Sequence, residues 1–281
     1  KALHFKMKDF NGTFRPLGIT PDRKKKTGMR AAIIREKGVN GDREMAYALW
    51  LAGFDVKDVH MTDLISGRET LEDLNMVVFV GGFSNSDVLG SAKGWAGAFR
   101  YNKKAREALD RFYKRNDTLS LGVCNGCQLM AELGLIVPEH DQMPRLEHNA
   151  SQKFESNFLG VKITDGQSVM LNGLGGMELG IWVAHGEGRF ILPYTEEKYN
   201  IVMKYSMSSY PANPNGSMYD VAGICSADGR HLAMMPHLER AFLPWQCAHY
   251  PADRHNDDVT PWMKAFVNAR KWIEKRIRQA H

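Results

Sequence analysis

The sequence predicts an α/β fold, a doubly wound and mostly parallel sheet flanked by helices, with a more strand-rich second half. Three observations predict it. Several segments are apolar throughout, as expected of strands that are covered on both faces. Segments with helical spacing separate these strands in the first half, and short glycine turns join them. The 281 residues are 43% hydrophobic, which is ample for a buried core.

In order along the first half, strand and helix alternate. The predicted strands are 31–34, 55–60, 76–80 and 120–123, because each is a nearly continuous apolar run or has strand-like composition. The predicted helices are 44–52, 103–113 and 128–133. In the second of these, Ala105, Leu109 and Phe112 fall on one helical face.

The second half favours strands. Candidates are 161–164, 180–184, 201–205, 221–226 and 232–235. The turn-rich stretch PANPNGS, residues 211–217, interrupts them, and an amphipathic basic helix over 261–278 closes the chain.

The net charge of +5 is concentrated near the start of the chain. Residues 1–30 contain nine Lys or Arg against two Asp, so the remainder is slightly acidic. Residues 1–28 lack any sustained helical or alternating pattern, and we expect a poorly ordered linker or leader remnant there. Residues 29–281 then form the folded domain.

Composition also narrows the setting of the protein. Because the basic charge belongs to one segment, we expect no nucleic-acid partner. No apolar run reaches the roughly 18 residues of a membrane span, and no secretory signal is recognisable, so we expect no membrane contact and a cytoplasmic location. Four cysteines without a dense framework indicate reduced thiols.

The stretch LGVCNGCQLM contains a candidate nucleophile. Gly122, Cys124 and Gly126 form the pattern G-x-nucleophile-x-G, which is typical of a sharp strand-to-helix turn. The amino end of the following helix favours a thiolate. A redox pair of Cys124 with Cys127 stays open as an alternative, whereas a zinc site is disfavoured because Cys225 and Cys247 lack a paired spacing.

Two histidines are candidates for the base that a cysteine nucleophile requires. His237 follows the strand 232–235 in MMPHLER, and on an extended backbone Glu239 would lie on the same side and orient the imidazole. His185, in HGEGR, competes, with Glu187 also two residues away. Because Gly186 and Gly188 flank a loop suited to approach a ligand, we interpret His185 as facing the substrate.

Donors for a developing oxyanion are expected at the same edge of the sheet. Gly82 follows the strand 76–80, and Asn125 comes directly after the nucleophile, so their backbone N–H groups are the candidates.

These motifs together resemble the class I glutamine amidotransferases, which have a flavodoxin-like fold and a Cys, His, Glu triad. The stretches REKGVN, GGFSNSDVLGSAKGWA, LGVCNGCQLM, HGEGR, YPANPNGS and PWMKAFVNARK are similar to the glutaminase domain of formylglycinamide ribonucleotide amidotransferases. The similarity runs from about Met29 to the final helix.

The resemblance implies that Cys124, His237 and Glu239 hydrolyse glutamine to glutamate and ammonia through a thioester. It also implies a glutamine pocket made of Phe83, Gln128, His185, Gly186 and Glu187. The ammonia would pass to an ATP-using synthetase region, in the same longer polypeptide or in a partner subunit, which converts formylglycinamide ribonucleotide to the amidine. We expect no cofactor or metal in this domain, with ATP and Mg on the synthetase region alone.

Two departures from the family pattern stand out. Leu238 replaces the proline of P-H-P-E-R, and Asn85 and Ser86 stand in the common S-Y-G-D after GGF, where the glycine is lost. Neither change removes a reacting group. Two alternatives to a glutaminase stay open: a non-catalytic regulatory or docking domain of the same fold, and a thiol oxidoreductase.

Overall fold

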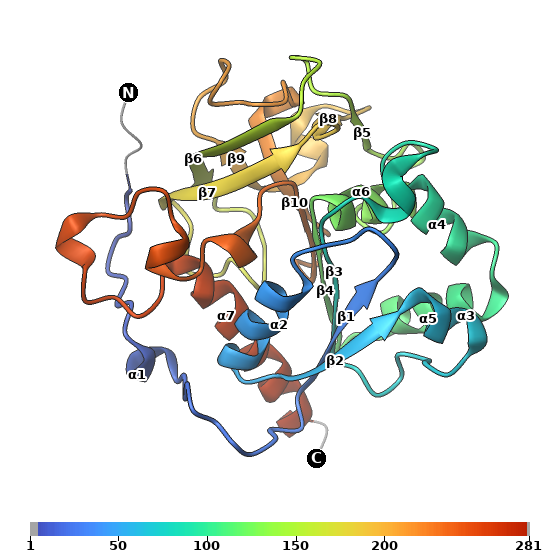
Figure 1. Cartoon of the computed structure of the whole chain (residues 1–281), viewed down its shortest axis with the longest axis horizontal. Helices are drawn as coiled ribbons and strands as arrows, with labels where there is room; N and C mark the ends of the chain where they lie inside the picture. The colour runs from blue at the N-terminus through green and yellow to red at the C-terminus, as the bar shows by residue number, and fades with distance from the viewer. Residues whose placement is uncertain (1–4, 280–281) are drawn as a thin grey trace.

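The computed structural model describes residues 5–279 and shows a nine-stranded mixed sheet with helices packed around it (Figure 1). The strand order is β2-β1-β3-β4-β11-β10-β9-β6-β7, and β5 and β8 form a separate pair. The strands are β1 (Arg30–Arg35), β2 (Asp55–His60), β3 (Met76–Phe79), β4 (Leu119–Val123), β5 (Arg145–Glu147), β6 (Glu155–Ile163), β7 (Glu178–His185), β8 (Arg189–Ile191), β9 (Asn200–Tyr205), β10 (Val221–Cys225) and β11 (His231–Met234).

The helices cover both faces of this sheet. They are α1 (Phe14–Leu17), α2 (Asp42–Ala52), α3 (Met61–Ser66), α4 (Lys93–Arg100), α5 (Lys103–Lys114), α6 (Asn125–Glu132) and α7 (Pro261–Gln279). Short 3₁₀ helices include η1 (Ser84–Asp87) and η4 (Leu238–Arg240). No helix within residues 5–279 is long and apolar enough to cross a membrane.

The first half of the sheet is parallel, as the sequence predicts. The strands β2, β1, β3, β4 and β11 run parallel to one another, and β3, β4 and β11 are buried along their whole length. Helix α2 packs against α7 on one face, whereas α3, α4, α5 and α6 gather on the other (Figure 1). This arrangement confirms the predicted α/β architecture.

The second half extends the sheet with antiparallel strands. β10 pairs antiparallel with β11, and β9, β6 and β7 follow, each antiparallel to its neighbour. Each predicted strand has a counterpart, but β6 begins at Glu155 rather than at Val161. The added part begins with three polar residues and is only partly buried, and it pairs with β7, so the apolar pattern did not show it.

Helices α3 and α4 were not predicted. The sequence of α4, KGWAGAFR, contains two glycines, which weaken intrinsic helix propensity. Its Trp95, Ala96 and Phe99 are nevertheless buried in the core. Tertiary packing of one apolar face therefore decides this helix.

The N-terminal segment lies along the domain, whereas we expected a poorly ordered linker. Arg23 donates to the carbonyl of Phe54 at 2.7 Å and pairs with Asp55 at 3.1 Å. The segment also buries apolar side chains in the core, namely Met7, Phe10, Leu17 and Ile19. Their irregular spacing gives no helical or strand signal, which is why the sequence did not show this packing. Residues 1–4, which belong to the same expectation, lie outside the described residues.

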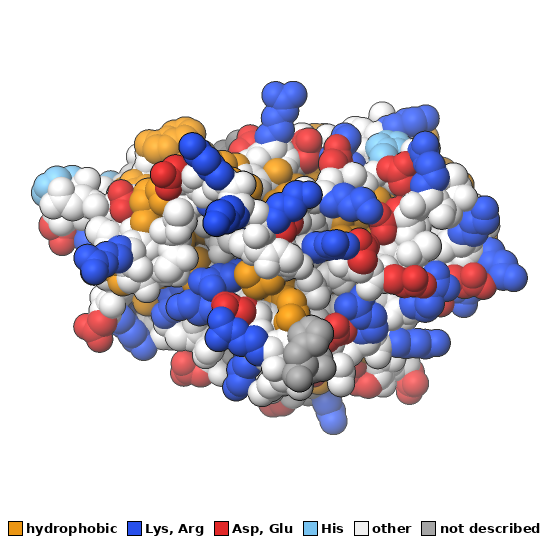
Figure 2. All heavy atoms as spheres, turned by 90° about the horizontal axis from the view of Figure 1, so that it is seen from below, with side chains coloured by type: hydrophobic (Ala, Val, Ile, Leu, Met, Phe, Trp, Pro, Cys, Tyr) orange, Lys and Arg blue, Asp and Glu red, His pale blue; other side chains and the backbone are white. Residues whose placement is uncertain are grey.

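Four basic residues of this segment, Arg23 to Lys26, lie at the amino ends of the parallel strands. Figure 2, which views the molecule from below, shows Lys and Arg over this face with Asp and Glu between them. The residues 23–26 line a cavity of about 550 Å³ there. Arg30 pairs with Asp73, and Lys57 with Glu69, so part of the charge is neutralised within the chain.

Candidate active site

Cys124 stands on a sharp turn between β4 and α6. Its backbone adopts φ 53° and ψ −107°, a combination that non-glycine residues rarely occupy. A Cβ on Gly122 would lie 2.5 Å from Met130 Sδ, and one on Gly126 only 1.9 Å from the Phe79 oxygen. Both glycines are therefore required for the turn to pack against β3 and its own helix.

The Cys124 thiol is 5% exposed and faces β7, with Sγ 3.6 Å from the carbonyl oxygen of Ala184. Because Cys124 precedes α6, the unpaired N–H groups of the first helical turn favour negative charge there. Cys127, in contrast, is fully buried, and this burial, with Cys124 nearby, raises the pKa of its thiol well above the ordinary value. Cys127 therefore stays protonated at neutral pH, which disfavours the redox alternative.

His237 lies beyond the end of β11 and is held by the edge strand β7. The backbone N–H of His237 donates to the carbonyl of Trp182 at 2.8 Å. The Nδ1 atom of its imidazole lies 2.6 Å from Glu239 Oε1. Both side chains are almost completely buried. Within residues 5–279, His237 Nε2 has no hydrogen-bond partner, so this nitrogen is left for the thiol or a substrate.

The expectation of an extended backbone after His237 is wrong. Leu238 to Arg240 form the 3₁₀ helix η4, with His237 as the residue before it. The tight turn, rather than strand alternation, brings the Glu239 carboxylate to the imidazole. Leu238, which replaces the family proline, is fully buried and keeps this turn in the core.

Two glycines make room for the histidine and the carboxylate. A Cβ on Gly81 would lie 2.8 Å from His237 Cε1 and 3.3 Å from Cys124 Cβ, so Gly81 lies against both side chains. A Cβ on Gly41 would lie 3.2 Å from Glu239 Oε1. Neither Gly81 nor Gly41 was predicted as a site residue, because no local pattern connects these glycines to residues so far along the chain.

The electrostatics of His237 match a Cys–His nucleophile. Burial alone would lower the pKa of the imidazole, but the charges of Glu239 and Cys124 outweigh it and raise this pKa to about 9. The imidazole is therefore protonated at neutral pH. A thiolate beside an imidazolium can attack an electrophilic carbon and then supply a proton to a leaving group.

The loop after β3 is bent by residues in the left-handed region. Gly82 has φ 119°, and Asn85, Ser86 and Asp87 follow with φ 51°, 56° and 49°. A Cβ on Gly82 would lie 2.5 Å from Val39 Cα, so the loop packs closely on the segment 38–40. Ser86, which stands where the family has glycine, keeps the left-handed conformation at a cost in strain. The loop carries the candidate oxyanion donor Gly82.

A chain of side-chain hydrogen bonds joins this loop to the rest of the site. The Ser84 N–H donates to Asn125 Oδ1 at 3.1 Å, and Asn125 Nδ2 donates to Gln128 Oε1 at 2.9 Å. Gln128 Nε2 donates to the carbonyl of Glu187 at 2.7 Å, and the Glu187 carboxylate accepts from the Ser91 N–H at 3.3 Å. The structure therefore brings Asn125, Gln128 and Glu187 together beside the nucleophile.

His185 is buried, and its ring nitrogen Nε2 faces Asn215 Nδ2 at 3.0 Å. Burial, with the charge of His237, lowers the pKa of His185 to about 3, so the ring is neutral. A Cβ on Gly188 would lie 2.2 Å from His185 Cδ2. The absence of a side chain at Gly188 therefore makes room for the His185 ring. Sequence reasoning missed Asn215, since the turn PANPNGS signals only a bend.

Phe83 and Gly186 border a second aromatic residue, Phe154. The Phe83 ring is 48% exposed and its centroid lies 6.1 Å from that of Phe154. A Cβ on Gly186 would lie 3.9 Å from the same Phe154 ring. The two loops expected to bind glutamine therefore meet at Phe154.

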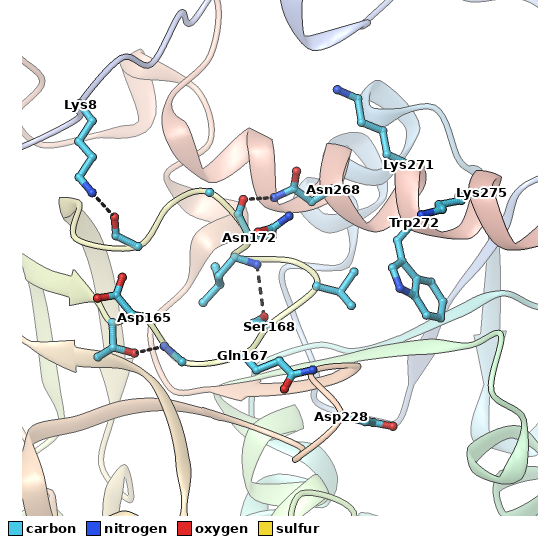
Figure 3. A pocket seen from close by; sticks show the side chains of 16 residues that line it. Lys8, Asp165, Gln167, Ser168, Asn172, Asp228, Asn268, Lys271, Trp272 and Lys275 are labelled. Carbon is cyan, nitrogen blue, oxygen red and sulfur yellow. Dashed lines mark hydrogen bonds between the residues drawn. The ribbon is translucent and has the colours of Figure 1, made fainter.

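A cavity of about 800 Å³ lies away from these residues. Figure 3 shows it between the loop 164–175 and α7, with Lys8, Lys271 and Lys275 around it. None of the predicted site residues lines it, so this cavity is not the site that the sequence predicts. Within residues 5–279, no group of three or more His, Cys, Asp or Glu is arranged to hold a metal ion.

Comparisons with known proteins agree with this geometry. Residues 28–273 match the family described as CobB/CobQ-like glutamine amidotransferase domain. The chain is 47% identical over 269 residues to phosphoribosylformylglycinamidine synthase of Homo sapiens, covering 86% of this chain and 20% of that protein. It is 46% identical over 270 residues to the probable chloroplastic/mitochondrial phosphoribosylformylglycinamidine synthase of Arabidopsis thaliana, covering 87% and 19%.

Solved structures show the same fold. A chain of the PurLQS structure from Thermotoga maritima matches with a TM-score of 0.66 at 25% identity, covering 87% of this chain and 99% of that one. A glutamine amidotransferase from the same organism matches with a TM-score of 0.53 at 14% identity, covering 88% and 99%. The chain spans about one fifth of the length of the curated relatives it matches.

Proposed function

The chain belongs to the CobB/CobQ-like glutamine amidotransferase domain family, and from this premise we propose that it hydrolyses glutamine to glutamate and ammonia. The observation that carries the proposal is the Cys124 thiol on its strained turn, beside a buried imidazole whose Nδ1 is bound by Glu239. The non-catalytic alternative gains no support, since these three groups and both glycines of the turn are intact.

The proposed reaction has two halves. The Cys124 thiolate attacks the side-chain amide carbon of glutamine and forms a C–S bond, and negative charge moves to the amide oxygen. His237, protonated because its pKa is about 9, gives its proton to the amide nitrogen, the C–N bond breaks, and ammonia leaves. Water then attacks the thioester while His237 takes its proton, which releases glutamate and the thiolate. Glu239 holds the imidazole in one orientation throughout.

We propose that the backbone N–H groups of Gly82 and Asn125 receive the oxyanion. Two observations support this proposal: Asn125 is the first residue of helix α6, and Gly82 packs closely against the segment 38–40. Losing one such donor typically costs about 3 to 4 kcal/mol of barrier. The bonded residues Gln128 and Glu187, with Phe83, His185 and Gly186, form the proposed glutamine pocket.

The ammonia is proposed to serve a synthetase region that lies outside this chain. The curated relatives are about five times longer than the match and are named phosphoribosylformylglycinamidine synthase. That name supports formylglycinamide ribonucleotide as the acceptor, with ATP and Mg used on the synthetase region. A cytoplasmic location is part of the same proposal, and the chloroplastic/mitochondrial name of the plant relative makes an organelle the alternative to test.

A glutamine-like diazo ketone tests the glutaminase directly. The reagent should alkylate Cys124, and excess glutamine should prevent the labelling, because both compounds need the same pocket and nucleophile. Mass spectrometry of the digested protein locates the adduct. Labelling of Cys127 to the same extent, or labelling that ignores glutamine, would count against the glutaminase.

A further inference from the structure

A second cavity, of about 420 Å³, lies directly behind the loop that follows Gly82. The end of β1 and helix α4 complete its walls. We name it the loop cavity; it is lined by Glu36, Ser84, Asn85, Val88, Leu89, Gly94 and Ala98. Its lining includes neither Cys124 nor any residue of the proposed glutamine pocket.

Two buried polar side chains, Ser84 and Glu36, are among the residues that line the loop cavity. Ser84 is 1% exposed, and its Oγ has no hydrogen-bond partner among residues 5–279. Glu36 is also buried, and one carboxylate oxygen accepts from the N–H of its neighbour Lys37 at 2.8 Å. A buried hydroxyl without a partner is unfavourable, and a buried carboxylate favours a cationic partner. Both groups would be satisfied by a positively charged hydrogen-bond donor.

The rim of the loop cavity is apolar and exposed. Val88 is 81% exposed and Leu89 is 71% exposed, and Ala98 of α4 lies across from them. Long cationic side chains bury an aliphatic stem along apolar surface and carry their donors at the tip. An acidic interior behind an apolar rim therefore fits a Lys or Arg side chain better than it fits an apolar or acidic one.

The loop cavity is mechanically connected to the proposed catalytic residues. Ser84, which lines the cavity, donates its backbone N–H to the side chain of Asn125, the residue directly after the candidate nucleophile. The residues that follow, Asn85 to Asp87, are all held in the left-handed region. A strained segment persists only when its surroundings fix it, so a ligand in the cavity would shift the loop toward one conformation.

We propose that the loop cavity receives a Lys or Arg side chain from the synthetase region, and that this contact fixes the Gly82 loop for glutamine hydrolysis. The inference rests on the proposed function, because it names the partner and the regulation of that same site. Charge complementarity argues for this partner: the cavity lacks the donor that a basic side chain provides. The result is hydrolysis that accelerates only when the synthetase region is docked.

The test uses the full-length enzyme, comprising this chain and its synthetase region, with Glu36→Gln and the double variant Val88→Ser/Leu89→Ser. Each should lower the glutamine-dependent turnover number at least about tenfold. Amination with free ammonia should change less than twofold, because it bypasses this chain. Glu107→Gln, an exposed carboxylate of α5, is the matched control and should behave as wild type. If both test variants keep glutamine-dependent turnover within twofold, the proposal is overturned.

A photo-crosslinking residue at position 88 identifies the occupant. The adduct should join position 88 to the synthetase region, next to a Lys or Arg whose replacement by Met reproduces the loss in Glu36→Gln. An adduct on a second copy of this chain, or none, contradicts the proposal. Cys124→Ser distinguishes failure of the proposed function from failure of the loop cavity inference. If Cys124→Ser leaves glutamine-dependent turnover intact, the proposed function fails. If Cys124→Ser abolishes this turnover while Glu36→Gln has no effect, only the loop cavity inference fails.

Discussion

The neighbouring strands β4 and β11 place a histidine beside a hydroxyl or thiol residue at both of their ends. At the carboxyl ends, beyond the last strand residues, are Cys124 and His237. At the amino ends, Ser120 Oγ lies 2.9 Å from His231 Nδ1, and the Tyr113 hydroxyl donates to the same Ser120 oxygen at 2.8 Å. Both ends therefore combine a buried histidine with a buried hydroxyl or thiol residue, although His231 is paired directly with Ser120 whereas His237 lies three residues beyond Met234, the last residue of β11.

Their electrostatics are opposite. Burial lowers the pKa of both imidazoles, but Glu239 and Cys124 reverse this at His237, whose pKa rises to about 9. At His231, burial and the charge of Arg230 together lower the pKa to about 4, and Asp228 only partly offsets them. Backbone geometry differs as well, since Ser120 sits in a regular buried strand and Cys124 on a strained turn. A carboxylate partner and a strained turn therefore distinguish the carboxyl ends, where the proposed catalytic residues lie, from the amino ends.

Separate replacement of Cys124, Ser120 and Cys127 should test this comparison most sharply. Cys124→Ser should lower glutamine hydrolysis by the full-length enzyme by at least about 10⁴-fold, because the thiolate is the attacking group. Ser120→Ala and Cys127→Ser should stay within about threefold, since neither side chain takes part in the reaction. Ammonia release from glutamine measures all three. A loss in Cys127→Ser as large as in Cys124→Ser would restore the redox interpretation.

Removing the carboxylate should make the His237 end resemble the His231 end. Glu239→Gln keeps the size of the side chain but not its charge, so hydrolysis should fall by about 10³ to 10⁴-fold. The protonated imidazole is lost as pH rises through about 9 in the wild type, and the alkaline limb of kcat should lie there. In Glu239→Gln that limb should move to lower pH. An unmoved limb would show that Glu239 does not control the imidazole.

The contact of Gly81 with both reactive side chains offers a subtler change. Gly81→Ala places a Cβ within 3.4 Å of His237 and Cys124, so the pair must separate, and hydrolysis should fall by about 10²-fold. Gly97→Ala in α4 is the control, because its Cβ would meet nothing closer than 3.8 Å. It should leave activity unchanged and stabilise the helix by about 0.5 to 1 kcal/mol. If both variants had equal activity, the prediction that Gly81 makes room for the catalytic pair would be wrong.

The strand-and-helix pattern predicted the fold because apolar runs and helical spacing are local signals. The turn at Cys124 was predictable for the same reason, since its glycines, nucleophile and helix lie within a few residues. Glu239 was placed near His237 for the wrong reason, because a 3₁₀ turn and an extended strand can both bring residues two apart together. Gly41 and Asn215 could not be predicted, because their partners come from distant segments that meet only in the folded chain.

The pair at the amino ends of β4 and β11, Ser120 and His231, should affect the pH dependence of the unfolding free energy rather than the activity. The pKa of His231 in the folded chain, about 4, lies below its ordinary value of 6.5. Unfolded chains therefore bind more protons between these values, so the contribution of neutral His231 is complete above about pH 6.5 and is lost as pH falls toward 4. By pH 5 the loss should reach about 2 kcal/mol of unfolding free energy.

His231→Asn does not titrate but can still bond Ser120. Between pH 7.5 and pH 5 the unfolding free energy of this variant should therefore fall by about 2 kcal/mol less than that of the wild type. Urea unfolding at both pH values measures the difference, and equal losses in variant and wild type would mean that His231 is not held neutral by its surroundings.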